Sequence, residues 1–204
     1  MKQIRIIEHV SLDGVIQAPG GPEEDTGNGF GHGGWAFPHF DPAVGEAIDA
    51  AHGDRFDLLL GRRTYDIWAG YWPHQKGPMA DSLSKAVKFV ATHRPESLAW
   101  GPVESLGVDI VDGIRQVKSG EGPDLVLWGS STLTPLLIAE GLADEVVLLV
   151  FPVMIGRGKR IYSDLAAPSE LALIDVKATD SGVTIHRYRP AGALRTGSFA
   201  DTAD

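Results

Sequence analysis

The chain contains no cysteine among its 204 residues. Disulfide bonds, a thiolate nucleophile and cysteine-ligated metals are therefore excluded, and a reducing compartment is weakly favoured. Apolar runs stay well short of the ~20 residues that a membrane span requires. The start of the chain, Met1 to Glu8, is too interrupted by charge for a signal peptide. These absences predict a cytoplasmic protein with no membrane partner.

Basic residues are scarce as well. Eighteen Lys and Arg against 27 Asp and Glu leave a formal charge of -9. Binding of nucleic acid requires clustered positive charge, so no nucleic-acid partner is expected. An anionic ligand must instead be bound by a few local donors. The length suits one domain, which we place at 1–190, and the small, polar segment 191–204 is predicted to be disordered.

The histidines show no metal-binding spacing such as H-E-x-x-H. We predict no metal site, although a site assembled from distant loops stays open, and with it a metal-dependent hydrolase. Serine catalysis is poorly supported, because Gly129-Ser130-Ser131 lacks the second glycine of a nucleophile elbow.

Short apolar runs alternate with helical patterns along most of the chain. Strands are predicted at 4–10, 57–60, 87–91, 124–128 and 145–153, and helices at 42–52, 64–69, 78–86, 109–118 and 133–139. Two further strands, 172–178 and 183–188, flank a hairpin turn. The order predicts an α/β fold with a mostly parallel sheet and an antiparallel C-terminal hairpin. The glycine- and proline-rich stretch 11–38 is predicted to be an active-site lid.

Three turns follow apolar runs, and two of them carry arginine. They are Gly61-Arg62-Arg63-Thr64, Thr92-His93-Arg94 and Gly129-Ser130-Ser131. In an open α/β sheet, ligands bind beyond the carboxyl ends of strands, where free N–H groups at helix starts bind anions. The Thr64 hydroxyl and an arginine would add donors to a phosphate. Thr92 to Arg94 suits the 2′-phosphate that distinguishes NADP from NAD. The alternative is an ordinary helix start and surface turn with solvated arginines.

Six segments together carry a family resemblance. They are Ser11-Leu12-Asp13-Gly14-Val15, Gly61-Arg62-Arg63-Thr64-Tyr65, Val90-Ala91-Thr92, Gly129-Ser130-Ser131-Thr132-Leu133, Gly141-Leu142-Ala143-Asp144-Glu145 and Pro152-Val153-Met154-Ile155-Gly156-Arg157-Gly158. In this order they resemble the dihydrofolate reductase-like superfamily. The most similar branch is typified by the C-terminal reductase domain of the bifunctional riboflavin-biosynthesis deaminase/reductase. The resemblance implies a three-layer fold with helices on both faces of a twisted sheet, NADPH as hydride donor and a homodimer.

The resemblance also implies site residues. It places Gly61, Arg62, Arg63 and Thr64 at the cofactor phosphates, and Thr92, His93 and Arg94 at the adenosine 2′-phosphate. It places Gly129, Ser130, Ser131, Thr132 and Leu133 beneath the pyrophosphate, and Asp13, Gly14 and Val15 near the nicotinamide and substrate. One position departs from that branch, which has a glutamate where this chain has Trp128.

The implied activity is reduction of a small heterocycle similar to a pyrimidine or pteridine. Examples are 5-amino-6-(5-phosphoribosylamino)uracil reductase of riboflavin biosynthesis and dihydrofolate reductase. Such a reaction needs a proton source, and we expect Asp13 to supply or organise it, provided that burial raises its pKa. The alternative is that Asp13 only hydrogen-bonds the Gly14 turn. Trp35, Trp72 and Trp128 are expected to wall the substrate. A non-catalytic ligand-binding protein on the same scaffold is the rival function.

Overall fold

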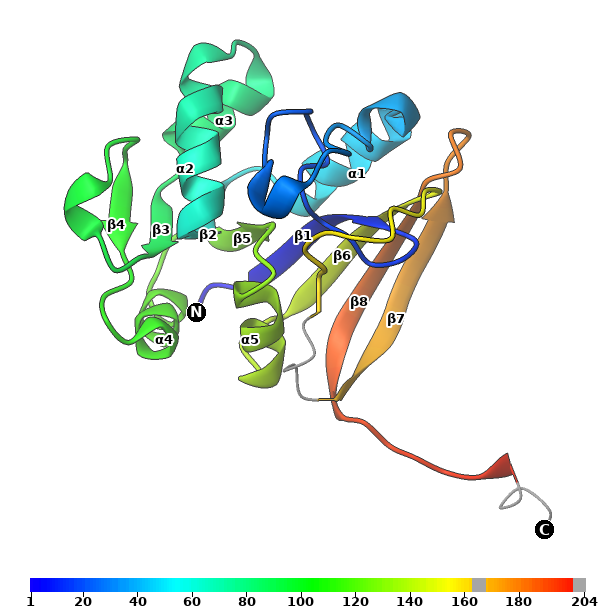
Figure 1. Cartoon of the computed structure of the whole chain (residues 1–204). Coiled ribbons are helices and arrows are strands. Elements are labelled where there is room, and N and C mark those ends of the chain that lie inside the picture. Colours follow the sequence, from blue (N-terminus) through cyan, green and yellow to red (C-terminus); the bar gives the residue numbers. More distant parts are fainter. Residues whose placement is uncertain (163–167, 200–204) are drawn as a thin grey trace.

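One sheet organises the part of the chain that the computed structural model describes, residues 1–162 and 168–199 (Figure 1). Within these residues the sheet has eight strands in the order β4-β3-β2-β5-β1-β6-β8-β7. The strands are β1 (Ile4–Ser11), β2 (Phe56–Gly61), β3 (Lys88–Ala91), β4 (Val103–Ser105), β5 (Asp124–Trp128), β6 (Glu145–Phe151), β7 (Ser169–Ala178) and β8 (Thr184–Ala193). Pairs among β1 to β6 are parallel, and β8 is antiparallel to both β6 and β7. The predicted mostly parallel sheet with antiparallel C-terminal strands is confirmed.

Helices cover both faces of the sheet. They are α1 (Pro42–His52), α2 (Arg62–Tyr71), α3 (Pro78–Lys85), α4 (Ile110–Ser119) and α5 (Leu133–Ala139). The first three pack on one face and the last two on the other (Figure 1). Alternation along β1 separates the two cores, because Ile7 faces α1 to α3 while Ile4 and Ile6 face α4 and α5. None of the described helices is long and apolar enough to cross a bilayer.

The largest differences from the sequence prediction are a missed strand and the extent of β8. Strand β4 was not predicted, because three residues carry no recognisable period and the strand exists only through its pairing with β3. Residues 191–193, assigned to a disordered tail, belong to β8, where Ala193 pairs with Ser169. Residues 200–204 of that predicted tail lie outside the described residues.

The chain order of the strands creates a meeting point at one edge of the sheet. The chain runs outward from β2 to β4 and then returns, so that β5 is inserted between β2 and β1. The carboxyl ends of β1, β2 and β5 therefore lie together. Such a reversal of strand order is where open α/β sheets form ligand sites. The irregular segment 12–41 lies over this edge between β1 and α1 (Figure 1).

Candidate active site

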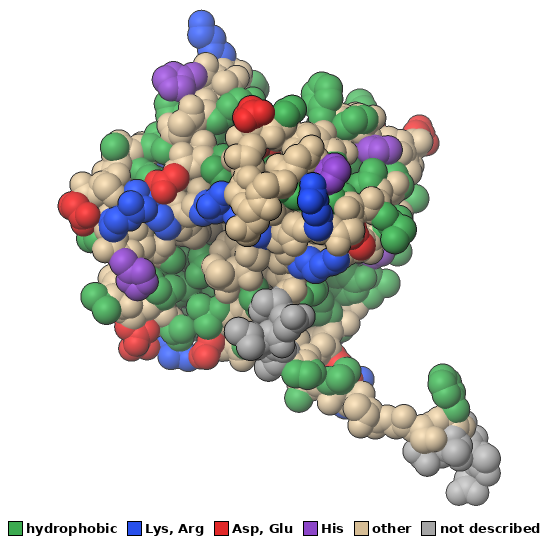
Figure 2. All heavy atoms as spheres, viewed as in Figure 1, with side chains coloured by type: hydrophobic (Ala, Val, Ile, Leu, Met, Phe, Trp, Pro, Cys, Tyr) green, Lys and Arg blue, Asp and Glu red, His purple; other side chains and the backbone are tan. Residues whose placement is uncertain are grey.

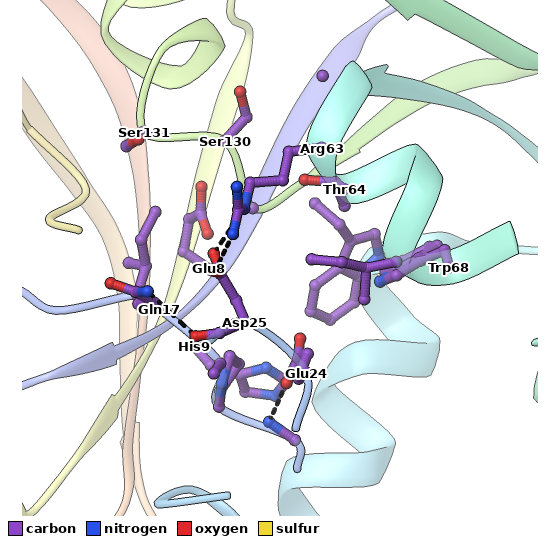
Figure 3. Close-up of a pocket in the computed structure, with 18 of the residues that line it drawn as sticks. Glu8, His9, Gln17, Glu24, Asp25, Arg63, Thr64, Trp68, Ser130 and Ser131 are labelled. Carbon is purple, nitrogen blue, oxygen red and sulfur yellow. Dashed lines mark hydrogen bonds and ion pairs between the residues drawn. The ribbon is translucent and has the colours of Figure 1, made fainter. Parts of the chain in front are cut away.

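A cavity of about 880 Å³ opens at the carboxyl ends of β1, β2 and β5. Its wall comes from β1, from residues 16–25, from α1 to α3 and from the turn after β5 (Figure 3). The volume lies within the range of about 300–1,000 Å³ that small-molecule sites occupy. Figure 2 shows Lys and Arg side chains on the face over α2 and the segment before α1, although the net charge of the chain is -9.

The turns after β2 and β5 pack directly against each other in this wall. A Cβ atom on Gly61 would lie 2.9 Å from Ser130 Oγ, and one on Gly129 would lie 3.3 Å from Thr64 Oγ1. Gly129 also has a φ of 61°, a conformation that favours glycine. Because neither Gly61 nor Gly129 has a side chain, the start of α2 and the turn at 129–133 can form one surface rich in backbone N–H groups. All nine residues, Gly61 to Thr64 and Gly129 to Leu133, line the cavity, and their binding of a cofactor stays a prediction.

Arg62 ties α2 to the loop after β3. Its Nη1 donates to Thr92 Oγ1 at 3.1 Å, to the Arg94 carbonyl at 3.0 Å and to Ser97 Oγ at 2.8 Å. Thr92 is buried, whereas His93 and Arg94 are exposed beside the cavity and do not line it. The hydrogen bonds of Arg62 thus hold the predicted turn at 92–94 next to the predicted turn at 61–64.

Arg63 and Lys159 share one carboxylate. Arg63 Nε lies 2.9 Å from Asp25 Oδ2, its Nη2 also bonds Oδ1, and Lys159 Nζ lies 2.5 Å from Oδ2 (Figure 3). Burial alone would raise the pKa of Asp25, but the hydrogen bonds from the two cations outweigh it and lower that pKa to about 2. Two cations on the cavity wall are therefore held by one ionised aspartate.

Glu8 is a buried acid in the wall. The residue is 2% exposed, and its Oε1 accepts from Thr134 Oγ1 at 2.9 Å. Among the described residues it forms no ion pair. Burial raises the pKa of Glu8 to about 8, and the hydrogen bonds from Thr134 and from the Gly129 backbone offset this only in part. Glu8 is therefore a neutral carboxylic acid at pH 7, beneath the turn that follows β5 (Figure 3).

Two neutral histidines border the same cavity. His52 Nε2 accepts from Trp128 Nε1 at 2.9 Å, and burial, followed by the charge of Arg5, lowers the pKa of His52 to about 4. His9 packs against Trp128 with ring centroids 5.4 Å apart, and burial lowers its pKa to about 4. In the described part of the chain, His9 Nε2 is buried without a hydrogen-bond partner. No group of three His, Asp or Glu side chains within 1–162 and 168–199 could hold a metal ion.

The predicted tryptophans divide between the cavity and the core. Trp72 and Trp128 line the cavity, and both rings lie near Trp68, at 5.9 Å and 6.2 Å between centroids. Trp35 does not line it. Its Nε1 donates to the Gln17 carbonyl at 2.8 Å, and its ring meets Phe151 edge-on at 5.5 Å. Trp35 therefore anchors the loop to the core, and the lining of this cavity gives no support to the prediction that it contacts the substrate.

Asp13 also lies outside the cavity. Its carboxylate accepts from Ser11 Oγ at 2.6 Å and from the backbone N–H groups of Ile155 and Gly156 at 3.1 and 2.7 Å. The Ser11 hydroxyl and then these N–H groups lower the pKa of Asp13 to about 2, so the side chain is an anion that has no proton to donate at neutral pH. This geometry argues against the proton-source prediction and favours a structural role.

The neighbours of Asp13 are structural as well. Val15 is fully buried beside Phe30, and Gly14 adopts a φ of 85° in the turn. The loop contribution to the cavity begins one residue later, at 16–20.

Sequence reasoning missed Glu8, His9, Asp25 and Trp68 as residues of the site. One signal was available for Glu8. Successive side chains of a strand point to opposite faces, and Glu8 points to the same buried face as Ile4, Ile6 and Val10. An acid at this position is therefore expected to be buried. Asp25 had no such signal, because a glycine-rich loop has no period from which burial can be read.

Residues 2–185 match the RibD C-terminal domain family. The Bacillus subtilis protein YyaP, described as uncharacterized, is 26% identical over 189 residues, which cover 90% of this chain and 93% of that protein. A pyrimidine reductase-like protein from Corynebacterium diphtheriae superposes with a TM-score of 0.62 at 12% identity, over 93% of this chain and 92% of its own. Dihydrofolate reductase from Enterococcus faecalis, solved with NADP(H), superposes with a TM-score of 0.58 at 14% identity, over 92% of this chain and 96% of its own. These two likenesses confirm the dihydrofolate reductase-like fold. Because the family match spans nearly all of the sequence, the chain belongs to the RibD C-terminal domain family.

Proposed function

We propose that this protein is an NADPH-dependent reductase of a small planar heterocycle. One observation carries the proposal: a single cavity joins a wall of helix-start N–H groups and cations to a wall of tryptophans. The first wall is suited to the phosphates of a dinucleotide and the second to a flat ring. A reductase has to hold both partners in one enclosed space.

The residues present fit the cofactor. Gly61 provides no side-chain cap to α2, which leaves the N–H groups of its first turn suited to a phosphate. Arg63 and Lys159 lie at the same wall, where a phosphate would compete with Asp25 for them. His93 and Arg94, exposed at the end of β3, would hold the 2′-phosphate. When bound, NADPH supplies the hydride. The protein binds and orients it, and the segment over the sheet edge excludes water.

We assign the role of proton donor to Glu8. As a neutral acid in the wall, it can donate its proton to the substrate nitrogen or oxygen while the adjoining carbon gains the hydride. The carboxylate that remains is reprotonated from water. Thr134 holds Oε1 in place throughout. This assignment replaces Asp13.

Calorimetric titration with NADPH and NADH, followed by NADPH consumption with pterins, pyrimidines, quinones and aldehydes, tests the proposal. We expect saturable binding that prefers NADPH and turnover of at least one heterocycle. Saturable binding without turnover on any compound would support the rival ligand-binding protein. Absence of NADPH binding would end the proposal.

We also propose that the protein works as a homodimer. Leu173, Ile174 and Val176 on β7 are 56%, 49% and 50% exposed. An outer strand with such residues is suited to burial against a second copy. Sedimentation equilibrium tests this, and a monomer at micromolar concentration would contradict it.

A further inference from the structure

The cavity wall has two chemically different parts. One part, which we call the aromatic lobe, is formed by seven side chains from α1, α2, α3, β5 and the short 3₁₀ helix after α2: Ile48, His52, Trp68, Trp72, Met79, Leu83 and Trp128. Six of them belong to one continuous apolar cluster, and the seventh, His52, bonds Trp128. The opposite part carries every basic side chain of the cavity wall in the described residues.

The aromatic lobe contains no charged side chain. Its one titratable group, His52, is neutral at pH 7 because burial lowers its pKa to about 4. The Trp128 indole N–H donates a hydrogen bond to His52 Nε2 at 2.9 Å, so neither group needs a further partner. A ligand in this lobe therefore meets flat apolar surfaces and finds no counter-ion.

The cations elsewhere in the wall are already paired with carboxylates. Arg62 Nε lies 2.8 Å from Asp66 Oδ1, and Arg63 and Lys159 both bond Asp25. Burial of an anion without a partner costs several kcal/mol. A phosphate or carboxylate on a ring in the aromatic lobe would be buried without a partner, so it would weaken binding.

One polar atom at this side of the cavity lacks a partner. His9 lines the cavity and contacts the Trp128 ring, and its Nε2 is buried with no hydrogen bond to any described residue. An unsatisfied buried nitrogen of this kind calls for a ligand or water. A neutral imidazole can act as donor or acceptor according to its tautomer.

We propose that the substrate is an uncharged planar ring, without phosphate or carboxylate, that stacks among Trp68, Trp72 and Trp128 and hydrogen-bonds His9. The inference rests on the proposed reductase function. It separates this chain from reductases of phosphorylated or carboxylated substrates.

Pterin and pterin carboxylate, which differ by one charged group, test the inference. Their binding is measured by calorimetry in the presence and absence of NADPH. We expect pterin to bind at least about tenfold more tightly, because 1.4 kcal/mol of uncompensated charge already gives that ratio. Equal or tighter binding of the carboxylate, or no binding of pterin, would overturn the inference.

Three variants sharpen the test. Met79→Lys places a cation in the aromatic lobe and should reduce or reverse the preference for pterin. Trp72→Leu should weaken pterin binding, whereas Phe37→Leu, at an exposed position outside the cavity wall, should not. An unchanged preference in Met79→Lys would count against the inference. NADPH titration of the same samples separates the two hypotheses, because normal NADPH binding without pterin binding contradicts only the substrate class.

Discussion

The guanidinium of Arg63 and the carboxylate of Asp25 form a two-point ion pair across the cavity wall, with Arg63 Nε 2.9 Å from Asp25 Oδ2. The two side chains differ in exposure, at 59% for Arg63 and 7% for Asp25. The same carboxylate also holds Lys159. Two cations that are suited to a phosphate are therefore occupied by a residue of the long loop, so an incoming anion must compete with Asp25.

Replacing Asp25 by Asn should strengthen NADPH binding. The change releases Arg63 and Lys159 for the cofactor, and one recovered charge-assisted contact corresponds to about tenfold in Kd. Calorimetric titration measures the effect. Asp66→Asn is the matched control, because Arg62 keeps its bonds to Thr92, Arg94 and Ser97. Weaker binding in Asp25→Asn would mean that Asp25 orients the cations instead of competing for them.

Glu8→Gln should remove most of the turnover and leave NADPH affinity unchanged. Loss of a general acid costs about 10²–10⁴ in rate. Turnover of the wild-type protein should fall as pH rises through about 8, where Glu8 loses its proton. The residual rate of the variant should not show this decrease with pH. A wild-type-like rate in Glu8→Gln would exclude the assignment.

The same residue predicts a pH dependence of stability. Between pH 4.5, the ordinary pKa of a glutamate side chain, and about 8, folded Glu8 keeps a proton that the unfolded chain has lost. The free energy of unfolding should therefore decrease as pH rises through this window. Urea unfolding at several pH values measures the slope, and Glu8→Gln should flatten it.

Asp13→Asn should lower stability without affecting the proton-transfer step. The amide keeps one acceptor oxygen where the carboxylate uses two, so the N–H of Ile155 or Gly156 loses its partner. We expect a loss of about 1–3 kcal/mol in the free energy of unfolding. Because the pKa of Asp13 is about 2, wild-type and variant stabilities should converge as pH falls from about 4 toward 2. A large drop in kcat with normal stability would restore Asp13 as a catalytic candidate.

Gly33→Ala should disturb the loop over the cavity. A Cβ atom at this position would lie 2.5 Å from the Gly21 carbonyl oxygen and 2.7 Å from that of Pro22. We expect lower thermal stability and weaker ligand binding. Gly31→Ala is the control, because nothing lies within 4 Å of its added Cβ. Equal behaviour of the two variants would show that this close approach is not needed.

Arg94→Ala should weaken binding of NADPH and leave that of NADH unchanged. Loss of a hydrogen bond to a charged group costs about 1.5–3 kcal/mol, or at least about tenfold in Kd. Arg115→Ala, on α4 at the opposite face of the sheet, should have no effect on either cofactor. An equal loss for both cofactors would place Arg94 away from the 2′-phosphate.

Local patterns were sufficient for most elements. The start of α1 is readable from the sequence, because aspartate is a favoured helix cap and proline is favoured in the first turn, and Asp41 Oδ1 does accept from Val44 N. The turns after β2 and β5 were equally readable, because strand, glycine turn and helix follow one another directly in the chain. Strand β4 was missed, since its three residues become a strand only through pairing with β3.

The sequence by itself determined the α/β order, the two glycine turns and the family resemblance, because these depend on residues close together in the chain. Only the tertiary structure decided what each polar side chain does. Asp13 is clamped by N–H groups from residues 155 and 156, whereas Glu8 is buried away from any cation in the described residues. Two carboxyl groups five positions apart thus become an anion and a neutral acid, because pKa depends on burial and on partners that are distant in sequence.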